Sequence, residues 1–300
     1  MLFYLCDRGM QMNYIMLFIT ICGVFLQNVL KKQYNLKNKN TLCASFTFNV
    51  IISFSALVFF LIVSKGNFTY HLPTILGAAI FTVGYVVGTT FAIQAIRYGS
   101  LSLTSLVISY SLIIPAIYGI LFLHESFNIK TILGILLLII SLLLIYIKKG
   151  NCQESCPITL KWIVYAFLAF VGNGICSTTQ KLHQVAFPGQ YQNEFMIIAM
   201  AMSTVFCAIP LLFIHKEGMK QNLQYSMFFA IPTGLANAVT NLLVMILSAK
   251  LPASFMFPVI SAGGILITLL FSVTVFKEKL SKMQLTGFAV GILSIILLNL

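Results

Sequence analysis

The feature that most constrains this chain is a series of long apolar stretches that recurs from one end of the sequence to the other. Hydrophobic residues make up 59% of the 300 residues and charged residues only 8%, a balance typical of membrane proteins and not of soluble domains. An apolar run of about 18 or more residues is long enough to cross a bilayer as a helix. The runs show no alternation of apolar and polar residues, so strands of a β-barrel are not expected. The sequence therefore predicts an all-α polytopic membrane protein whose surroundings are the lipid bilayer.

Ten such spans can be placed along the sequence, after a short leader at 1–13. No gap between them is longer than about twenty residues, so we expect no sizeable water-soluble domain. The expected spans are 14–30, 41–64, 72–96, 101–123, 129–147, 158–179, 195–214, 225–249, 253–276 and 282–300.

The second half of the chain repeats the first. Residues 97–144 reappear 153 positions later with the same order of basic residue, apolar span, charged elbow and second apolar span. The corresponding pairs are Arg97 with Lys250, Glu125 with Glu278, Gly134 with Gly287 and Ser141 with Ser294. A weaker correspondence, at a shift of 149, pairs Gly23 with Gly172 and Asn28 with Ser177. A period this long indicates a duplication and not a solenoid.

The duplication divides the chain into a first five-helix repeat at 13–147, a hinge at 148–157 and a second five-helix repeat at 158–300. Because five is an odd number, the second repeat is expected to be inverted relative to the first in the membrane. Inverted repeats with a binding site at their interface are the usual construction of secondary transporters.

The net charge of +12 does not indicate nucleic acid as a partner, because the basic residues stand at the ends of the spans. Lysine and arginine at span ends set membrane topology and meet anionic headgroups. The seven cysteines are scattered, and no group of ligands has the spacing of a metal site. The sequence also lacks a Gly-rich phosphate loop and a cluster of catalytic side chains. We expect no cofactor, no metal and no enzymatic activity.

Several residues at the span ends resemble the EamA-type domain of the drug/metabolite transporter superfamily. In the first half these residues are Ala95, Ile96, Arg97, Tyr98, Ser100, Pro115, Glu125 and Gly134. In the second half they are 250–254, Pro258, 277–281, Gln284 and Gly287. The resemblance covers about residues 13–300. It implies ten transmembrane helices around a central pathway, with alternating access and export of a small metabolite or drug.

The last four helices of each half are also similar to the small multidrug resistance proteins, which belong to the same superfamily. That resemblance implies proton exchange on a membrane-embedded glutamate of the first helix. The acidic residues of this chain are Asp7, Glu125, Glu154, Glu194, Glu217 and Glu278, and none lies in the middle of a span. A carboxylate proton relay therefore has no candidate residue here.

Polar side chains inside the spans are the candidates for a solute pathway, because placing a polar group within the bilayer costs free energy and such groups often have a functional role. All of the candidates are neutral. They are Gln27, Asn28, Tyr85, Thr89, Gln94, Ser109, Tyr110, Asn173, Ser177, Gln180, Asn237, Asn241 and Ser261. Asn237 and Asn241 are four residues apart and so share one helix face. Two interpretations stay open for them, namely hydrogen bonds that join neighbouring helices and the lining of a wet cavity.

Small residues four apart, as in Gly84-x-x-x-Gly88 and Gly287-x-x-x-Gly291, let helices approach closely. We expect internal partners for both pairs, with a homodimer through the last helix as the alternative for the second. Prolines inside spans, among them Pro115 and Pro258, are expected to bend helices.

The sequence therefore predicts a secondary transporter that exports a small organic solute across the bacterial plasma (inner) membrane. The alternatives are a flippase for a lipid-linked sugar or other amphiphile, and a membrane assembly protein without transport activity. Orientation stays open. Thirteen basic residues stand on one side and five on the side of the termini, which places the termini outside, whereas the resemblance places them inside.

Overall fold

The computed structural model describes residues 2–37, 42–98, 104, 107–108, 110–123, 129–146, 159–213, 219–275 and 282–299. The elements within these residues are α-helices. They are α1 (Leu2–Lys37), α2 (Leu42–Ser64), α3 (Leu72–Tyr98), α5 (Ile113–Phe122), α6 (Ile129–Tyr146), α7 (Leu160–Ala186), α8 (Gln192–Phe213), α9 (Met219–Ser248), α10 (Ala253–Val275) and α11 (Lys282–Asn299). The predicted all-α class is confirmed for the described part of the chain.

Two helices differ clearly from the spans expected from hydropathy. The first begins at Leu2 and continues to Lys37, so the expected leader and the polar segment after residue 30 belong to the same helix. The fourth expected span, 101–123, is interrupted. There, α5 begins only at Ile113, after a turn at Ser111 and Leu112. Pro115 therefore lies in the first turn of α5, where a proline is tolerated and needs no bend.

Six helices in the described part of the chain are long and apolar enough to cross a membrane. They cover Gln11–Lys31, Cys43–Ser64, Leu72–Ala95, Leu160–Ala186, Gln192–Phe213 and Ser226–Ser248. Shorter apolar segments lie at Ile113–Phe122, Ile132–Ser141 and Ala253–Gly264. The protein is therefore an integral multi-pass membrane protein, and the exact number of ten spans stays a prediction. The elbow residues Glu125 and Glu278 and the hinge 148–157 lie outside the described residues.

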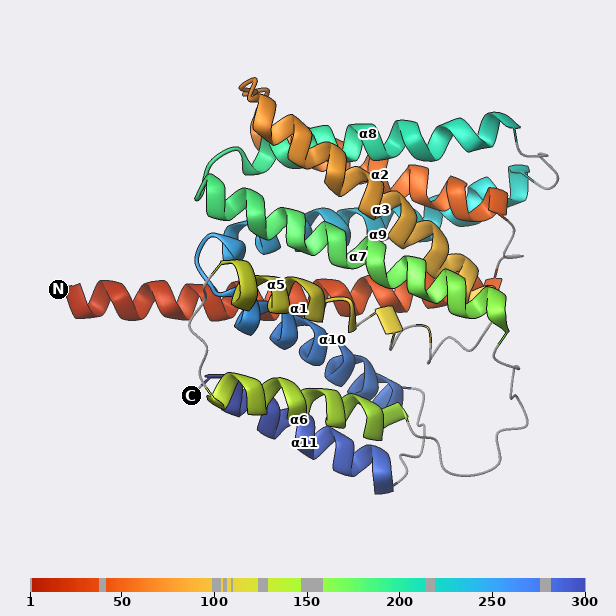
Figure 1. Cartoon of the computed structure of the whole chain (residues 1–300). Helices are drawn as coiled ribbons and strands as arrows, with labels where there is room; N and C mark the ends of the chain where they lie inside the picture. The colour runs from red at the N-terminus through yellow and green to blue at the C-terminus, as the bar shows by residue number, and fades with distance from the viewer. Residues whose placement is uncertain are drawn as a thin grey trace.

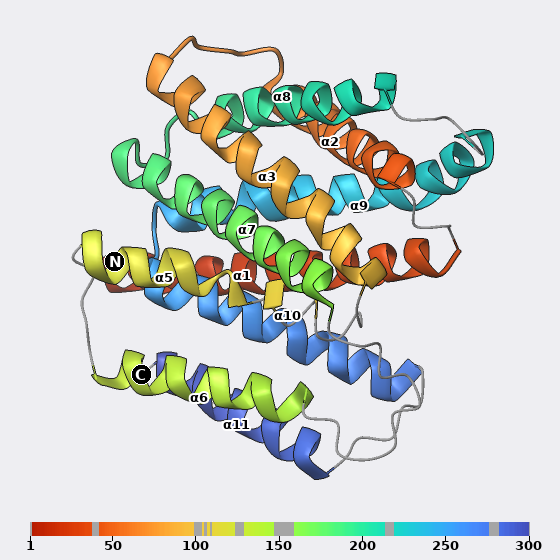
Figure 2. The ribbon, with the colours of Figure 1, turned by 45° about the vertical axis from the view of Figure 1, so that its right-hand side comes forward.

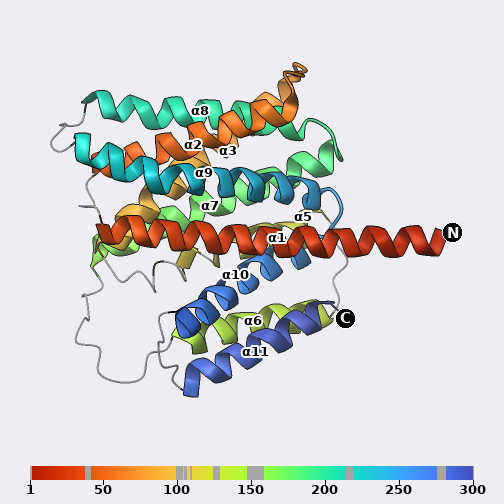
Figure 3. The same ribbon diagram turned by 180° about the vertical axis from the view of Figure 1, so that it is seen from behind.

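The helices lie side by side in one bundle, with α2 and α8 at one edge and the pair α6 and α11 at the other (Figure 1). Between these edges lie α3, α7, α9, α1, α5 and α10, as the turned view also shows (Figure 2). The start of α1 and the end of α11 are on the same side of the bundle (Figure 3). Most helix contacts join the two halves of the sequence. They pair α3 with α7, α1 with α9, α2 with α8 and α9, α3 with α8, α5 with α10, and α6 with α11.

The bundle has apolar side chains outside and many polar side chains inside. Phe18, Ile62 and Phe213 are 61%, 71% and 85% exposed, whereas Gln180 and Gln184 are 3% and 0% exposed. A soluble bundle has the reverse arrangement, because water solvates its outer face. In lipid, the outer face must be apolar, and polar groups are satisfied by partners within the bundle.

The close crossing of α3 and α7 depends on three glycines. A Cβ atom added to Gly172 would lie 2.5 Å from the Gly88 nitrogen and 2.6 Å from the Gly84 oxygen. Only hydrogen atoms fit between these backbones, so the two helices touch at this point. The Gly84-x-x-x-Gly88 pair therefore has an internal partner, as the spacing predicted.

Two reciprocal hydrogen bonds join α6 to α11. The Ser141 hydroxyl donates to the Gly287 carbonyl oxygen at 2.6 Å, and the Ser294 hydroxyl donates to the Gly134 carbonyl oxygen at 2.6 Å. A Cβ atom on Gly291 would also lie 2.6 Å from the Ser141 Oγ. The small-residue face of the last helix is thus covered by α6 of the same chain, and a homodimer through α11 would need a different face.

Candidate functional site

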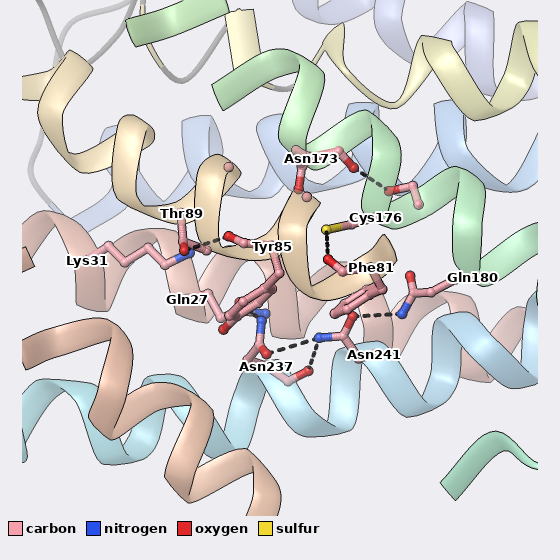
Figure 4. Close-up of a pocket in the computed structure, with 13 residues that line it drawn as sticks. Gln27, Lys31, Phe81, Tyr85, Thr89, Asn173, Cys176, Gln180, Asn237 and Asn241 are labelled. Carbon is pink, nitrogen blue, oxygen red and sulfur yellow. Dashed lines mark hydrogen bonds between the residues drawn. The ribbon is translucent and has the colours of Figure 1, made fainter. Parts of the chain in front are cut away.

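A polar cavity lies between α1, α3, α7 and α9, in the middle of the bundle (Figure 4). Its volume is about 130 Å³, several times the space that one water molecule needs. Thirteen residues line it, and most of them are polar: Gln27, Lys31, Phe81, Gly84, Tyr85, Gly88, Thr89, Asn173, Cys176, Ser177, Gln180, Asn237 and Asn241. Helices α1 and α3 come from the first half of the chain and α7 and α9 from the second, so the cavity lies at the interface of the halves.

A chain of four side-chain amides crosses the cavity from α7 through α9 to α1 (Figure 4). The Gln180 amide nitrogen donates to Asn241 Oδ1 at 2.9 Å, and the Asn241 nitrogen donates to Asn237 Oδ1 at 3.0 Å. The Asn237 nitrogen then donates to Gln27 Oε1 at 3.0 Å, and the Gln27 nitrogen donates to Thr240 Oγ1 at 3.1 Å. We call the series Gln180, Asn241, Asn237 and Gln27 the amide relay. All of its donors point in the same direction along the series, an arrangement in which hydrogen bonds polarise and strengthen one another.

The amide relay combines the two interpretations left open for Asn237 and Asn241. Their shared helix face joins α9 to α1 through Gln27 and to α7 through Gln180. The same two asparagines line the cavity. The interhelical bonds hold the amides in place, and the cavity leaves part of each amide open to a solute.

An aromatic pair from α3 forms another part of the wall. The rings of Phe81 and Tyr85 are nearly parallel, with their centroids 5.8 Å apart and an interplanar angle of 18°. These residues are four apart and so project from one helix face. Cys176 of α7 also lines the cavity, and its thiol donates to the Phe81 carbonyl oxygen at 3.5 Å. This side of the cavity can contact an apolar or flat part of a solute.

Asn173 connects the cavity to the interruption before α5. Its amide nitrogen donates to the Ser111 hydroxyl oxygen at 2.6 Å. Around Ser111 the backbone makes short turns, with the Ser111 nitrogen bonded to the Ile108 oxygen and the Ile114 nitrogen bonded to the Ser111 oxygen. Interrupted helices beside a binding site are common in transporters, because unwound backbone can be tolerated where it is buried in protein or faces a cavity.

Lys31 is the one charged residue among the thirteen that line the cavity. It lies four residues after Gln27 and therefore on the same face of α1. Its side chain extends toward Thr89 and Tyr85 of α3 (Figure 4). No aspartate, glutamate or histidine is among the lining residues. The cavity can therefore offer a solute neutral donors and acceptors, an aromatic surface and one ammonium group, and its lining residues have no carboxylate to carry a proton.

Eight of the thirteen predicted pathway residues line the cavity: Gln27, Tyr85, Thr89, Asn173, Ser177, Gln180, Asn237 and Asn241. Four of the other five lie elsewhere in the described structure. Asn28 is exposed on the outside of α1, and the Gln94 amide donates to Ser45 Oγ of α2 at 3.2 Å. Tyr110 has a buried hydroxyl without a hydrogen-bond partner in the described structure. Ser261 is buried in α10, and Ser109 lies outside the described residues.

The lining residues that were not predicted are Lys31, Phe81, Gly84, Gly88 and Cys176. A spacing of four residues was the available signal for three of them. Lys31 follows Gln27 by four, Phe81 precedes Tyr85 by four, and Cys176 precedes Gln180 by four. Lys31 was missed because it was assigned to a polar segment after the first span, whereas α1 continues beyond it.

Comparisons with known proteins give one family match. Residues 14–147 match the model of the EamA-like transporter family. No curated protein matches the chain. Among solved structures, 29 chains match. One of these is a crystal structure of a protein that is 12% identical, with a TM-score of 0.67, and the match covers 95% of this chain and 98% of that chain.

At this identity the crystal structure shows only that almost the whole chain has a known fold. The family match supplies more, because it names a group of membrane transporters and agrees with the multi-pass helical bundle described above. Over residues 14–147, which are somewhat less than half of its length, this chain is similar to the EamA-like transporter family of the drug/metabolite transporter superfamily.

Proposed function

We propose that this protein is a secondary transporter that exports a small organic solute by alternating access through the cavity between α1, α3, α7 and α9. The observation that carries the proposal is a polar cavity in the middle of an apolar bundle. Buried amides that served only to join helices would need no open space beside them. Polar groups that face a cavity at the interface of two halves are the usual form of a transporter site.

The proposal includes ten transmembrane helices in two inverted repeats, 13–147 and 158–300. Two sets of contacts support it. The hydrogen bonds of Ser141 and Ser294 to Gly287 and Gly134 are equivalent under the 153-residue shift and have equal lengths. The helix pairs α3–α7 and α9–α1 are likewise exchanged when each helix is replaced by its counterpart in the other half, and so are the pairs α2–α9 and α8–α3.

Movement of the halves against each other would open the cavity to one side of the membrane at a time. At the glycine crossing, α3 and α7 contact each other through backbone atoms without interlocking side chains. The two helices can therefore rotate against each other at this point. The interruption before α5, held to α7 by the Asn173–Ser111 hydrogen bond, supplies a second movable element. Location in the bacterial plasma (inner) membrane and an outward direction of transport are parts of the proposal that rest on the family.

The test compares two neighbouring residues of α1. Gln27 belongs to the amide relay, whereas Asn28 is exposed on the outer face. Purified Gln27→Leu, Asn28→Leu and wild-type protein would be reconstituted into vesicles, and counterflow of labelled amino acids, nucleosides, sugar phosphates and organic cations would be measured. We expect wild-type counterflow of one of these classes. Gln27→Leu should lower its rate at least about five- to tenfold, the equivalent of a single lost hydrogen bond, because it removes the bonds to both Asn237 and Thr240. Asn28→Leu should leave the rate unchanged.

Absence of counterflow in folded wild-type protein, or an equal loss in both variants, would refute the proposal. Movement of a lipid-linked sugar in place of these soluble compounds would favour the flippase alternative. A protein that transports none of these compounds and is recovered only with partner proteins would favour a role in assembly.

A further inference from the structure

The electrostatic character of the cavity depends on one side chain. Lys31 is part of an α-helix that continues for six more residues to Lys37, so its position is set by the helix and not by a loose segment. It stands at the end of the apolar segment Gln11–Lys31. A lysine in this place usually extends along the helix to reach the headgroups. Here the side chain instead extends toward Thr89 and Tyr85, on the cavity side of α1 (Figure 4).

No counter-ion accompanies this ammonium group in the described structure. Lys31 is the one charged residue among the thirteen that line the cavity, and no acidic side chain is among them. No hydrogen bond or ion pair joins Lys31 Nζ to another described residue. Lys181, a buried lysine of α7, shows the contrast, because it donates to the carbonyl oxygens of Ser248 and Leu251 at 3.1 and 2.7 Å. A charged group in the membrane without a partner is a candidate for a functional role.

The neutral side chains of the cavity add further donors. In the amide relay, the oxygens of Asn241, Asn237 and Gln27 each already accept a hydrogen bond from another amide. Asn237 and Gln180 each keep one amide N–H that the relay does not use. The hydroxyl of Tyr85 likewise donates to no described residue. Together with the three N–H groups of Lys31, these groups give the cavity several donors that a solute rich in acceptors can use, and Lys31 is the one charged donor among the lining residues.

We propose that Lys31 determines the charge preference of the transport site, so that the cavity accepts small organic oxyanions, either carboxylates or phosphate monoesters, and rejects cations. This inference rests on the transport function proposed above and names the class of its solute. The oxyanion would accept hydrogen bonds from Lys31 and Tyr85, and the remainder of the solute would lie against the rings of Phe81 and Tyr85. Hydrogen bonds from a charged donor to a charged acceptor are about twice as strong as neutral ones.

The experiment uses compounds of nearly equal shape and different charge. Binding of benzoate, benzamide and benzamidinium to the full-length protein in detergent would be measured by thermal shift, with phenyl phosphate to separate the two kinds of oxyanion. We expect benzoate to bind about tenfold more tightly than benzamide, and benzamidinium to bind most weakly. In Lys31→Gln, the affinities for benzoate and benzamide should come within about twofold, because the neutral amide no longer distinguishes them.

Two further variants act as controls. Lys31→Arg keeps the positive charge and should keep the order of affinities, which covers the case in which Lys31→Gln fails to fold. Lys250→Gln removes an exposed lysine just beyond the end of α9 and should also keep the order. If Lys250→Gln abolished the preference as well, the overall charge of the protein and not Lys31 would be responsible, and the inference would be wrong.

Benzamide or benzamidinium binding at least as tightly as benzoate, a benzoate preference that survives in Lys31→Gln, or no binding of any of these compounds would each overturn the inference. Counterflow separates this failure from failure of the proposed function. If counterflow of a neutral or cationic solute were lost in Gln27→Leu but intact in Lys31→Gln, the proposed transport function would stand and the oxyanion preference would be refuted. Selective benzoate binding without counterflow of any compound would support the oxyanion preference of the cavity and refute the proposed transport function.

Discussion

The reciprocal hydrogen bonds between α6 and α11 allow a quantitative test of the two-repeat architecture. In Ser141→Ala the Gly287 carbonyl oxygen loses its donor, and in Ser294→Ala the Gly134 carbonyl oxygen loses its donor. Both serines are buried, at 2% and 0% exposed, and the change removes only a hydroxyl group. An interhelical hydrogen bond in a membrane protein contributes about 0.6–2 kcal/mol. We expect each variant to lose about this free energy of unfolding.

The symmetry adds a stronger expectation. Both bonds run from a serine hydroxyl to a glycine carbonyl oxygen and have the same length. The two single variants should therefore lose equal free energy of unfolding, to within about 0.5 kcal/mol. On α6 the residues concerned, Gly134 and Ser141, are about 10 Å apart along the helix axis. Sites at this separation are close to additive, so the double variant should lose about 1–4 kcal/mol, the sum of the two single losses.

The assay is equilibrium unfolding of the reconstituted protein in mixed detergent and lipid, titrated with a denaturing detergent. Ser203→Ala is the matched control, since Ser203 is also 0% exposed but its hydroxyl has no hydrogen-bond partner in the described structure. This control should lose no stability. If Ser203→Ala lost as much as Ser141→Ala, or if the two single variants differed by more than about 1 kcal/mol, the reasoning from reciprocal bonds would be refuted.

Two further predictions concern the packing of α7. Gly172→Ala should cost about 1–3 kcal/mol of stability, because the new Cβ would lie 2.5 Å from the Gly88 nitrogen. Gly264→Ala should cost less, because its Cβ would meet only a side chain, at 3.2 Å. Equal thermal shifts in the two variants would contradict the steric argument. Trp162 is the single tryptophan of the chain and donates from its indole nitrogen to Thr104 Oγ1 at 2.9 Å. In Thr104→Val the fluorescence of the indole should move to shorter wavelength, because its donor loses a polar partner, and an unchanged spectrum would show that this bond is absent in solution.

The duplication in the sequence singled out four residues that the structure joins, although it predicted no contact between them. The shift of 153 residues pairs Gly134 with Gly287 and Ser141 with Ser294, and the structure joins these four residues by hydrogen bonds. Equivalent residues can meet in this way because the counterpart helices α6 and α11 pack against each other. The alignment of the two copies thus carried information about tertiary structure, although it did not reveal that the helices are neighbours.

The interruption before α5 was not predictable in the same way. The sequence from 101 to 123 is apolar enough on average, despite the serines and the threonine in its first half, to suggest one continuous span. Its turn at Ser111 is accompanied by the hydrogen bond from Asn173, a residue more than sixty positions away. A local pattern cannot report a partner at that distance in the sequence.

That this chain crosses a membrane as helices follows from its sequence alone, because apolar length and the need to satisfy every backbone polar group leave no other solution in lipid. The sequence also shows which spans contain polar side chains. Which of those side chains share a cavity depends on how the helices pack. Gln27 and Asn28 are adjacent and equally polar, yet one joins the amide relay and the other is exposed outside the bundle. Successive residues of a helix point about 100° apart, and the packing of α1 against α9 and α10 selects the direction that faces inward.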